Sequence, residues 1–109
     1  MAYKDLEKKK ATKKAYYSRP DIIKKQKQKK IDNKKRNSEY IKELKEKTPC
    51  MDCGKNYPYY VMDFDHVKDK KINGVGRMLQ YGFSTLKKEI AKCEIVCANC
   101  HRERTQNRL

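Results

Sequence analysis

The sequence predicts a small α+β domain that follows a basic, largely helical extension. Residues 1–49 contain 18 Lys/Arg and 7 Asp/Glu, but only 6 of the chain's 18 Leu, Ile, Val and Phe residues. Residues 50–109 contain the other 12, together with all five cysteines, in short apolar segments separated by polar turns. Because a packed core needs apolar residues, we expect the folded domain over 50–109 and the extension over 1–49.

The net charge of +15 and the sequence pI near 9.7 point to a polyanionic partner. Nucleic acid is the partner we expect, and a membrane is not, since the extension lacks the broad apolar face with which helices bind anionic lipid. No stretch approaches the roughly 20 apolar residues that cross a bilayer. The first 30 residues contain no apolar run typical of a signal peptide, so we expect a cytoplasmic location.

Good helix formers dominate the extension. Residues 1–17 are Lys-rich with little to bury, and Ser18-Arg19-Pro20-Asp21 is typical of a helix start, with a cap, a proline and an acid in the first turn. We expect this helix to reach Lys47, with an interruption at Asp32-Asn33, and to end at Thr48-Pro49. Three apolar residues share one face of its last turns and are expected to pack on the domain: Tyr40, Ile41 and Leu44.

The excess of Lys and Arg in the extension predicts contacts with nucleic-acid phosphates, although a solvated charged helix has the same composition. Phosphate contacts raise affinity and the rate of association, but they carry no base information. We therefore expect a largely non-specific grip on nucleic acid. The side chains expected to make it are Lys24, Lys25, Lys34, Lys35 and Arg36.

The domain begins with a Cys-x-x-Cys-Gly turn, and short elements follow. Aromatic and β-branched residues predict a strand over 59–66, and a short helix is expected over 76–80. Ser84 is expected to cap the helix "STLKKEIAK", whose Leu86 and Ile90 share one face. The run "CEIVC" predicts a second strand, and a polar, basic helix closes the chain.

Two Cys-x-x-Cys pairs, separated by 43 residues, predict a structural zinc ion. Both sulfurs of such a pair can reach one ion while the backbone turns beneath it, and a core of about 60 residues needs a staple of this kind. Cys93 is interpreted as a small, buried apolar residue; the alternative is that it replaces a member of the second pair. The four expected ligands are Cys50, Cys53, Cys97 and Cys100.

Two other interpretations of the second pair are disfavoured. Cys97-Ala-Asn-Cys100-His101 matches the c-type haem attachment pattern, but covalent haem attachment implies export and an apolar pocket. A thioredoxin-like redox site is disfavoured because no βαβ pattern surrounds either pair.

The two histidines lie next to residues that suggest metal-dependent hydrolysis. His66 follows Asp65 at the end of the first predicted strand, and His101 follows the second cysteine pair. A carboxylate and an imidazole that face each other can hold a hydrolytic divalent ion, and a second imidazole can take a proton from water. Both histidines can also serve structural roles. Three arginines of the last helix are candidates to hold the anionic substrate: Arg102, Arg104 and Arg108.

The order of "CMDCG", "DFDHV" and "CEIVCANCHRERT" resembles that of the zinc-bearing HNH endonucleases, over residues 50–105. The resemblance implies a ββα-metal fold stapled by a four-cysteine zinc site, and an endonuclease or nickase that hydrolyses DNA phosphodiester bonds. Many small proteins of this kind belong to phages and mobile elements. That origin implies the host cytoplasm as the location and other phage DNA-processing proteins as further partners.

The resemblance also implies roles for individual residues. His66 is the general base that activates water, and Asp65 and His101 hold one catalytic divalent ion, which is Mg²⁺, Mn²⁺, Ni²⁺ or Zn²⁺. No small-molecule cofactor is implied. The family's middle Asn, which orients the base, is absent from its expected place, where the chain has Lys92. Asn73 and Asn99 are the candidates to replace it.

Two further functions fit the same sequence. One is a non-catalytic zinc-ribbon module that binds DNA or RNA, which would share the zinc ion and the basic surface. The other is an accessory protein of a larger assembly, in which the extension docks on a protein instead of on DNA.

Overall fold

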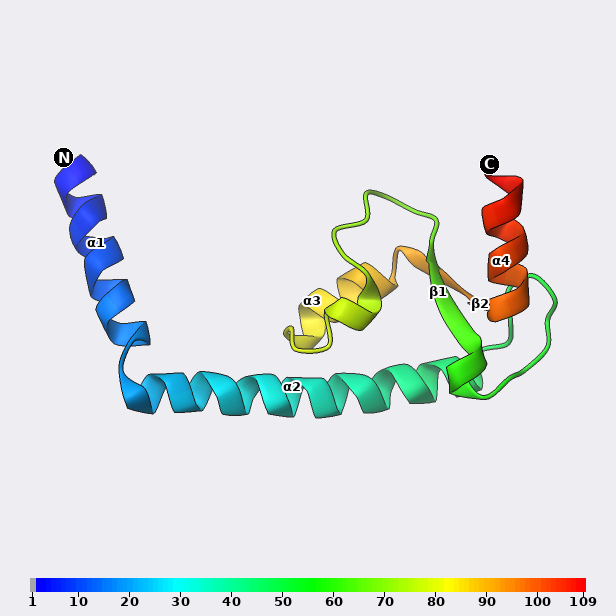
Figure 1. Ribbon diagram of the computed structural model, residues 1–109, viewed down its shortest axis with the longest axis horizontal. Helices are drawn as coiled ribbons and strands as arrows, with labels where there is room; N and C mark the ends of the chain where they lie inside the picture. The colour runs from blue at the N-terminus through cyan, green and yellow to red at the C-terminus, as the bar shows by residue number, and fades with distance from the viewer. Residues whose placement is uncertain (1) are drawn as a thin grey trace. The chain divides into compact units, whose positions relative to one another are not determined.

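The computed structural model describes residues 2–109 and has an α+β architecture, with a two-stranded antiparallel sheet (Figure 1). No helix in this range combines the length and the apolar character of a bilayer-spanning segment. The elements, in chain order, are α1 (Ala2–Tyr17), α2 (Pro20–Lys47), the 3₁₀ turn η1 (Tyr59–Val61), β1 (Met62–His66), the 3₁₀ turn η2 (Val75–Arg77), α3 (Phe83–Ile90), β2 (Cys93–Cys97) and α4 (Ala98–Asn107).

Packing divides the chain after Asp32, whereas composition suggested a division at residue 49. The first unit holds α1 and the first turns of α2, and its described side chains are exposed except that of Ile22. The second unit begins at Asn33 and includes the rest of α2. The last turns of α2 therefore belong to the folded domain.

The expected interruption of α2 at Asp32-Asn33 is wrong. Asp32 accepts a hydrogen bond from Gln28 one turn earlier, at 3.0 Å. The Asn33 amide donates to the carbonyl of Gln80 at 3.1 Å, in the loop before α3. With their side chains satisfied in this way, neither residue competes for the hydrogen bonds of the helix backbone.

The expected face on the last turns of α2 packs on the domain. Ile41 and Leu44 contact the core, and the Tyr40 ring meets that of Phe83 edge to face with centroids 4.9 Å apart. Asn37 is fully buried, and its amide donates to the carbonyls of Leu79 and Tyr81 at 2.9 and 2.8 Å. These contacts hold α2 against the loop that leads into α3.

The sheet pairs β1 with β2 in the register Met62↔Cys97, Phe64↔Ile95 and His66↔Cys93. The predicted bounds of β2 are correct, but β1 is shorter than the expected strand over 59–66. Pro58 precedes a 3₁₀ turn in which the Val61 amide donates to the Pro58 carbonyl at 3.0 Å, so the chain becomes extended only at Met62.

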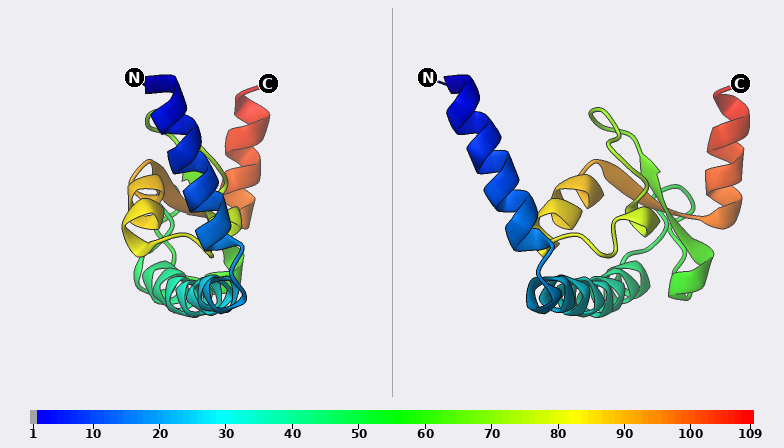
Figure 2. Two further views of the ribbon diagram at one scale, coloured as in Figure 1. Left: turned by 90° about the vertical axis from the view of Figure 1, so that its left-hand side faces the viewer. Right: turned by 60° about the vertical axis from the view of Figure 1, so that its left-hand side comes forward.

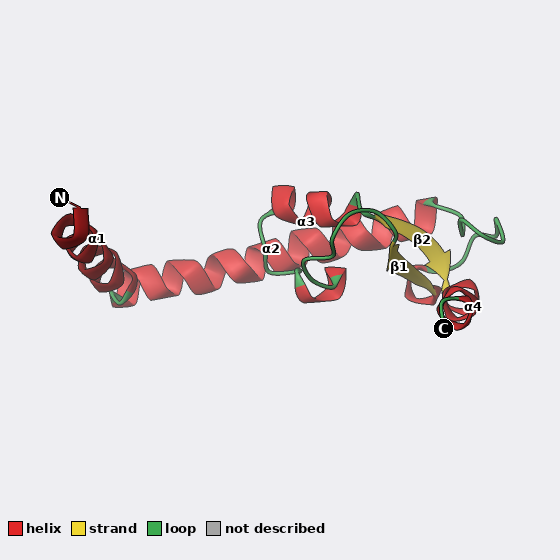
Figure 3. Ribbon diagram, turned by 90° about the horizontal axis from the view of Figure 1, so that it is seen from above, coloured by secondary structure: helices red, strands yellow, loops and turns green. Residues whose placement is uncertain are grey.

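The two strands lie between α3 and α4, an arrangement visible from two directions (Figure 2). Figure 3 shows β1 and β2 side by side in a third view. Because successive residues of a strand point to opposite faces, one face of β1 meets α3 and the other meets α4. This alternation decides which neighbour each candidate site residue contacts.

The core consists of two small clusters that share Phe64 at their edges. The first contains Cys50, Met62, Ile95, Val96 and Cys97, and the second contains Val75, Met78 and Leu86. So few buried side chains give a domain of this size little stability of its own.

Two predictions about helices near the second cluster are wrong. Ser84 does not cap α3, because the helix begins one residue earlier, after Gly82, and has no side-chain cap. The short helix expected over 76–80 is a single 3₁₀ turn over Val75–Arg77. The prediction for Leu86 and Ile90 is confirmed, since Leu86 is fully buried and Ile90 packs beside it.

Candidate functional site

The four cysteines of the two Cys-x-x-Cys pairs converge on one point. Their sulfur atoms all lie within 4.8 Å of one another, which is close enough to hold one metal ion. The first pair lies in the turn after α2, and the second joins the end of β2 to the first turn of α4. A shared ion would tie the entry of the domain to its last strand and helix.

Backbone amides already point at these sulfurs. Cys50 Sγ accepts hydrogen bonds from the amides of Cys53 and Cys97, at 3.5 and 3.3 Å. Burial opposes ionisation of Cys50, but these amides outweigh it and lower the pKa of its thiol to about 6. The pKa of Cys100 is raised instead, mainly by its hydrogen bond with Cys97. Four crowded thiols cannot all ionise together unless a cation compensates their charge, so the donor set suits a metal ion.

Cys93 lies outside this group, in agreement with its expected packing role. Its thiol donates to the Glu89 carbonyl at 3.5 Å, and it packs against the second core cluster. Burial raises the pKa of this thiol to about 11, so it remains protonated at neutral pH.

His101 turns away from the cysteines, towards two carboxylates of β1. Its Nδ1 lies 3.1 Å from Asp63 Oδ2, and its Nε2 lies 3.7 Å from Asp65 Oδ1. Asp63 and Asp65 are two residues apart on the strand and therefore share the face that meets α4. The structure thus brings together Asp65 and His101, the two residues expected to hold a catalytic ion.

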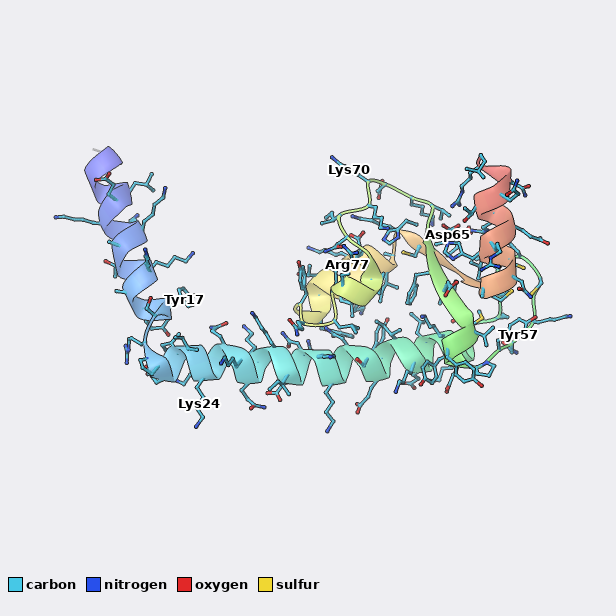
Figure 4. The ribbon with its side chains drawn as sticks, in the orientation of Figure 1. Tyr17, Lys24, Tyr57, Asp65, Lys70 and Arg77 are labelled. Carbon is cyan, nitrogen blue, oxygen red and sulfur yellow. The ribbon has the colours of Figure 1, made fainter. Side chains whose placement is uncertain are left out.

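Asp65 lies on the face of β1 that meets α4, and only 4 % of its surface is exposed (Figure 4). Arg108 contacts both of its oxygens, at 3.0 and 2.7 Å, and Arg104 donates to one of them at 2.9 Å. Arg108, opposed by burial and assisted by Arg104, lowers the pKa of Asp65 to about 2. The carboxylate is therefore ionised across the physiological range.

Arg104 joins several carboxylates at once. It contacts Asp52 through two hydrogen bonds of 2.6 Å and Glu94 through one of 3.0 Å, in addition to Asp65. These bonds connect α4 to both strands and to the first cysteine turn. The sequence suggested substrate contacts for Arg102, Arg104 and Arg108; in this structure Arg104 and Arg108 bind carboxylates, and Arg102 is exposed.

His66 lies on the other face of β1. Its Nε2 is 2.9 Å from Glu89 Oε2 on α3, and 13 % of its side chain is exposed. His66 and Asp65 are neighbours in sequence but have different partners, because they alternate across the strand. The structure does not gather Asp65, His66 and His101 around one point: within residues 2–109, the cysteines form the single set of three or more potential metal ligands at such short range.

Glu89 is a candidate site residue that the sequence did not single out. Only 1 % of its surface is exposed, yet it accepts hydrogen bonds from Lys92 Nζ at 2.8 Å and from the Ile72 amide at 3.1 Å, besides His66. Lys92, opposed by burial and assisted by the Ile72 amide, lowers the pKa of Glu89 to about 2. A signal was present in the sequence, because Glu89 shares the apolar face of Leu86 and Ile90, where an unpaired carboxylate would be costly.

The basic side chains of α2 that were expected to contact DNA are exposed. Lys24 and Lys25 belong to the first unit, and Lys34, Lys35 and Arg36 belong to the second. Arg36 also lies over the Phe83 ring, 5.2 Å from its centroid.

Comparison with known proteins identifies no relative: no family model, no curated protein and no solved structure matches this chain.

Proposed function

We propose that the protein is a metal-dependent DNA endonuclease or nickase of the HNH type, with a ββα-metal core formed by β1, β2 and α4. The observation that carries the proposal is the position of His101. It directly follows Cys100, one of the four clustered cysteines, yet it faces two carboxylates of β1 instead of the sulfurs. An imidazole beside two carboxylates, with a separate thiol cluster next to it, suits two ions of different kinds.

The thiol cluster suits zinc, since structural zinc ions are tetrahedral and four cysteine sulfurs are usual ligands for them. Such an ion would fix β2 and α4 to the turn that precedes β1. The catalytic centre would then be positioned by the staple without sharing its ligands.

Asp65 and His101 would hold the catalytic divalent ion, with Asp63 close enough to assist or to orient the imidazole. A carboxylate–imidazole set suits Mg²⁺, Mn²⁺, Ni²⁺ or Zn²⁺ with positions left for water and phosphate. Arg108 must leave Asp65 when a cation binds. Its side chain is 52 % exposed, so it has room to move and to contact the phosphate instead.

His66 would take the proton from the attacking water. It is the last residue of β1, so a phosphate lying across the end of this strand could reach both of its faces. When bound, the ion supplies stabilisation of the negative charge on the phosphate and on the leaving 3′ oxygen. The products would be a 5′ phosphate and a 3′ hydroxyl.

Lysines and arginines on α2 would contribute a non-specific grip on the DNA backbone. Other DNA-processing proteins of a phage, in the cytoplasm of its host, remain proposed partners.

Incubation of supercoiled plasmid with the zinc-loaded protein and Mg²⁺, Mn²⁺ or Ni²⁺ tests the proposal. Wild type should nick the plasmid, and His66→Ala should abolish nicking while zinc content and DNA affinity stay almost unchanged, since His66 lies outside the group of four clustered cysteines and its side chain bonds Glu89 of α3. Wild-type protein that leaves the plasmid intact with every ion would refute the proposal.

A second function, a non-catalytic zinc module that binds nucleic acid, is favoured by one observation. Arg104 and Arg108 already neutralise Asp65, which makes a rigid structural network without any catalytic ion. The same assay separates the two functions, because this module would bind the plasmid tightly and never cut it.

A further inference from the structure

Glu89 on α3 and His66 at the end of β1 form a largely buried contact. The two residues are 23 positions apart, and their side-chain atoms meet at 2.9 Å. This contact lies outside the set of ligands and arginines around Asp65.

A carboxylate at 1 % exposure needs an explanation, because a buried charge is costly unless it is paired and hydrogen-bonded. The Glu89 carboxylate has three hydrogen-bond partners, which are His66, Lys92 and the Ile72 amide. Lys92 supplies a positive charge and is itself held by the Lys70 carbonyl at 2.9 Å, while the Ile72 amide adds a second donor. Three partners from different parts of the chain therefore fix the Glu89 carboxylate in one position.

A fixed, ionised carboxylate determines the state of the imidazole that it contacts. Its oxygen can only accept a hydrogen bond, so the neutral His66 ring must carry its proton on Nε2. Nδ1 then keeps its lone pair, and no hydrogen-bond partner for Nδ1 is found among the described side chains and backbone. A carboxylate behind an imidazole also stabilises the imidazolium that forms after proton uptake.

We propose that Glu89 is a positioning residue for His66: it orients the ring, keeps the proton on Nε2 and so leaves Nδ1 to accept the proton of the attacking water. This inference rests on the proposed nuclease function. The family that the chain resembles has an Asn in the orienting role, and this chain has Lys92 at the expected position of that Asn. The inference assigns the role to Glu89, three positions earlier. Lys92 acts one step further back, by holding Glu89.

A purely structural role is the competing explanation, since the same hydrogen bonds join α3, β1 and the loop around Ile72. The two explanations differ in what a substitution changes. Loss of a structural bond lowers stability and leaves the cleavage rate of the folded protein unchanged. Loss of a positioning bond lowers the rate of the chemical step in protein that is folded, zinc-loaded and bound to DNA.

The test measures single-turnover nicking with protein in excess over plasmid, so that the rate reports chemistry and not binding. Glu89→Gln keeps the size and one acceptor but removes the charge, and we expect its rate to fall roughly 10–100-fold. Glu89→Ala removes the acceptor as well, and we expect a fall of about 10²–10⁴-fold. DNA affinity and zinc content should match those of wild type.

Glu103→Gln is the matched control, because it makes the same charge change at an exposed position of α4. It should cleave at the wild-type rate. A ¹⁵N-edited NMR spectrum adds a readout that does not depend on cleavage: wild type should show a slowly exchanging Nε2 proton of His66, assigned by its absence in His66→Gln, and Glu89→Ala should lose it.

The outcomes separate this inference from the proposed function. Active wild type together with a folded Glu89→Gln that cleaves at the wild-type rate overturns the role of Glu89 and leaves the nuclease function intact. If Glu89→Ala does not fold, Glu89→Gln alone decides. Wild type that never nicks the plasmid overturns both, whatever the NMR spectrum shows.

Discussion

The pKa of Glu89 lies near 2, below its ordinary value of 4.5, and this shift predicts how the stability of the domain depends on pH. A folded-state pKa below the unfolded value means that the ionised carboxylate stabilises the fold above about pH 4.5, and that this contribution is lost as the pH falls towards 2. The stability advantage of wild type over Glu89→Gln should therefore shrink between these pH values.

The measurement is the difference in melting temperature between the two proteins, followed from about pH 7 down to the lowest pH at which both still bind their ion and melt cooperatively. The range ends there because the domain is expected to unfold without the ion. A difference that stays constant as the pH falls below about 5 within this range would show that the Glu89 charge does not contribute to folding.

Residue patterns predicted the cysteine cluster and the Asp65–His101 approach but not the partner of His66. Spacing within a short segment constrains which sulfurs can share an ion, and two flanking pairs leave little choice. The partner of His66 depends on how α3 packs against β1, which is a tertiary contact between segments 23 residues apart. The buried position of Glu89 on an apolar helix face was the one local signal for it.

Helix α2 belongs partly to each of the two units, so deletions of different length should have different effects. Its first turns, with α1, contribute exposed charge, and its last turns bury Asn37 and pack the partly buried Ile41 and Leu44 on the domain. Deletion of residues 1–32 should leave a folded domain that binds DNA more weakly and with a shallower dependence on salt, because fewer counterions are released.

Deletion of residues 1–47 is the informative comparison. It also removes the packed turns with Ile41 and Leu44, and because these side chains are partly buried, each loss should cost at most about 2–5 kcal/mol, the range for fully buried Leu and Ile. Thermal unfolding of both variants, and DNA affinity at several salt concentrations, check these statements. A salt slope unchanged by the shorter deletion would exclude phosphate contacts by residues 1–32.

The sequence predicted the bounds of β2 but not the starts of β1 and α3 or the continuity of α2. The β-branched core of "CEIVC" predicted β2 correctly. Pro58 delayed β1 by imposing a 3₁₀ turn, and Gly82 replaced Ser84 as the residue before α3. Asn33 stayed helical because the Gln80 carbonyl, far along the chain, bonds its side chain.

The domain has two thin core clusters and four cysteines close enough to hold one metal ion, and we therefore expect its stability to depend on that ion. Removal of zinc with a chelator should unfold residues 33–109, since metal affinity contributes directly to the free energy of folding in small domains of this kind. Circular dichroism during chelator titration follows this loss, and added zinc should reverse it. The helical signal of the first unit should respond less.

Zinc stoichiometry in variants gives the control. Cys53→Ser should reduce zinc binding and stability together, whereas Cys93→Ser, outside the cluster, should keep one ion per chain. A domain that stays folded and cooperative after complete zinc removal would contradict the staple role.

The chemistry of the cut tests the proposed nuclease most directly. Supercoiled plasmid treated with zinc-loaded protein and a divalent ion should yield nicked circles that DNA ligase reseals without prior treatment, because hydrolysis leaves a 5′ phosphate and a 3′ hydroxyl. His66→Ala protein purified in parallel should yield none. An intact plasmid with wild type, or equal nicking by His66→Ala, would contradict a nuclease in which His66 activates the water.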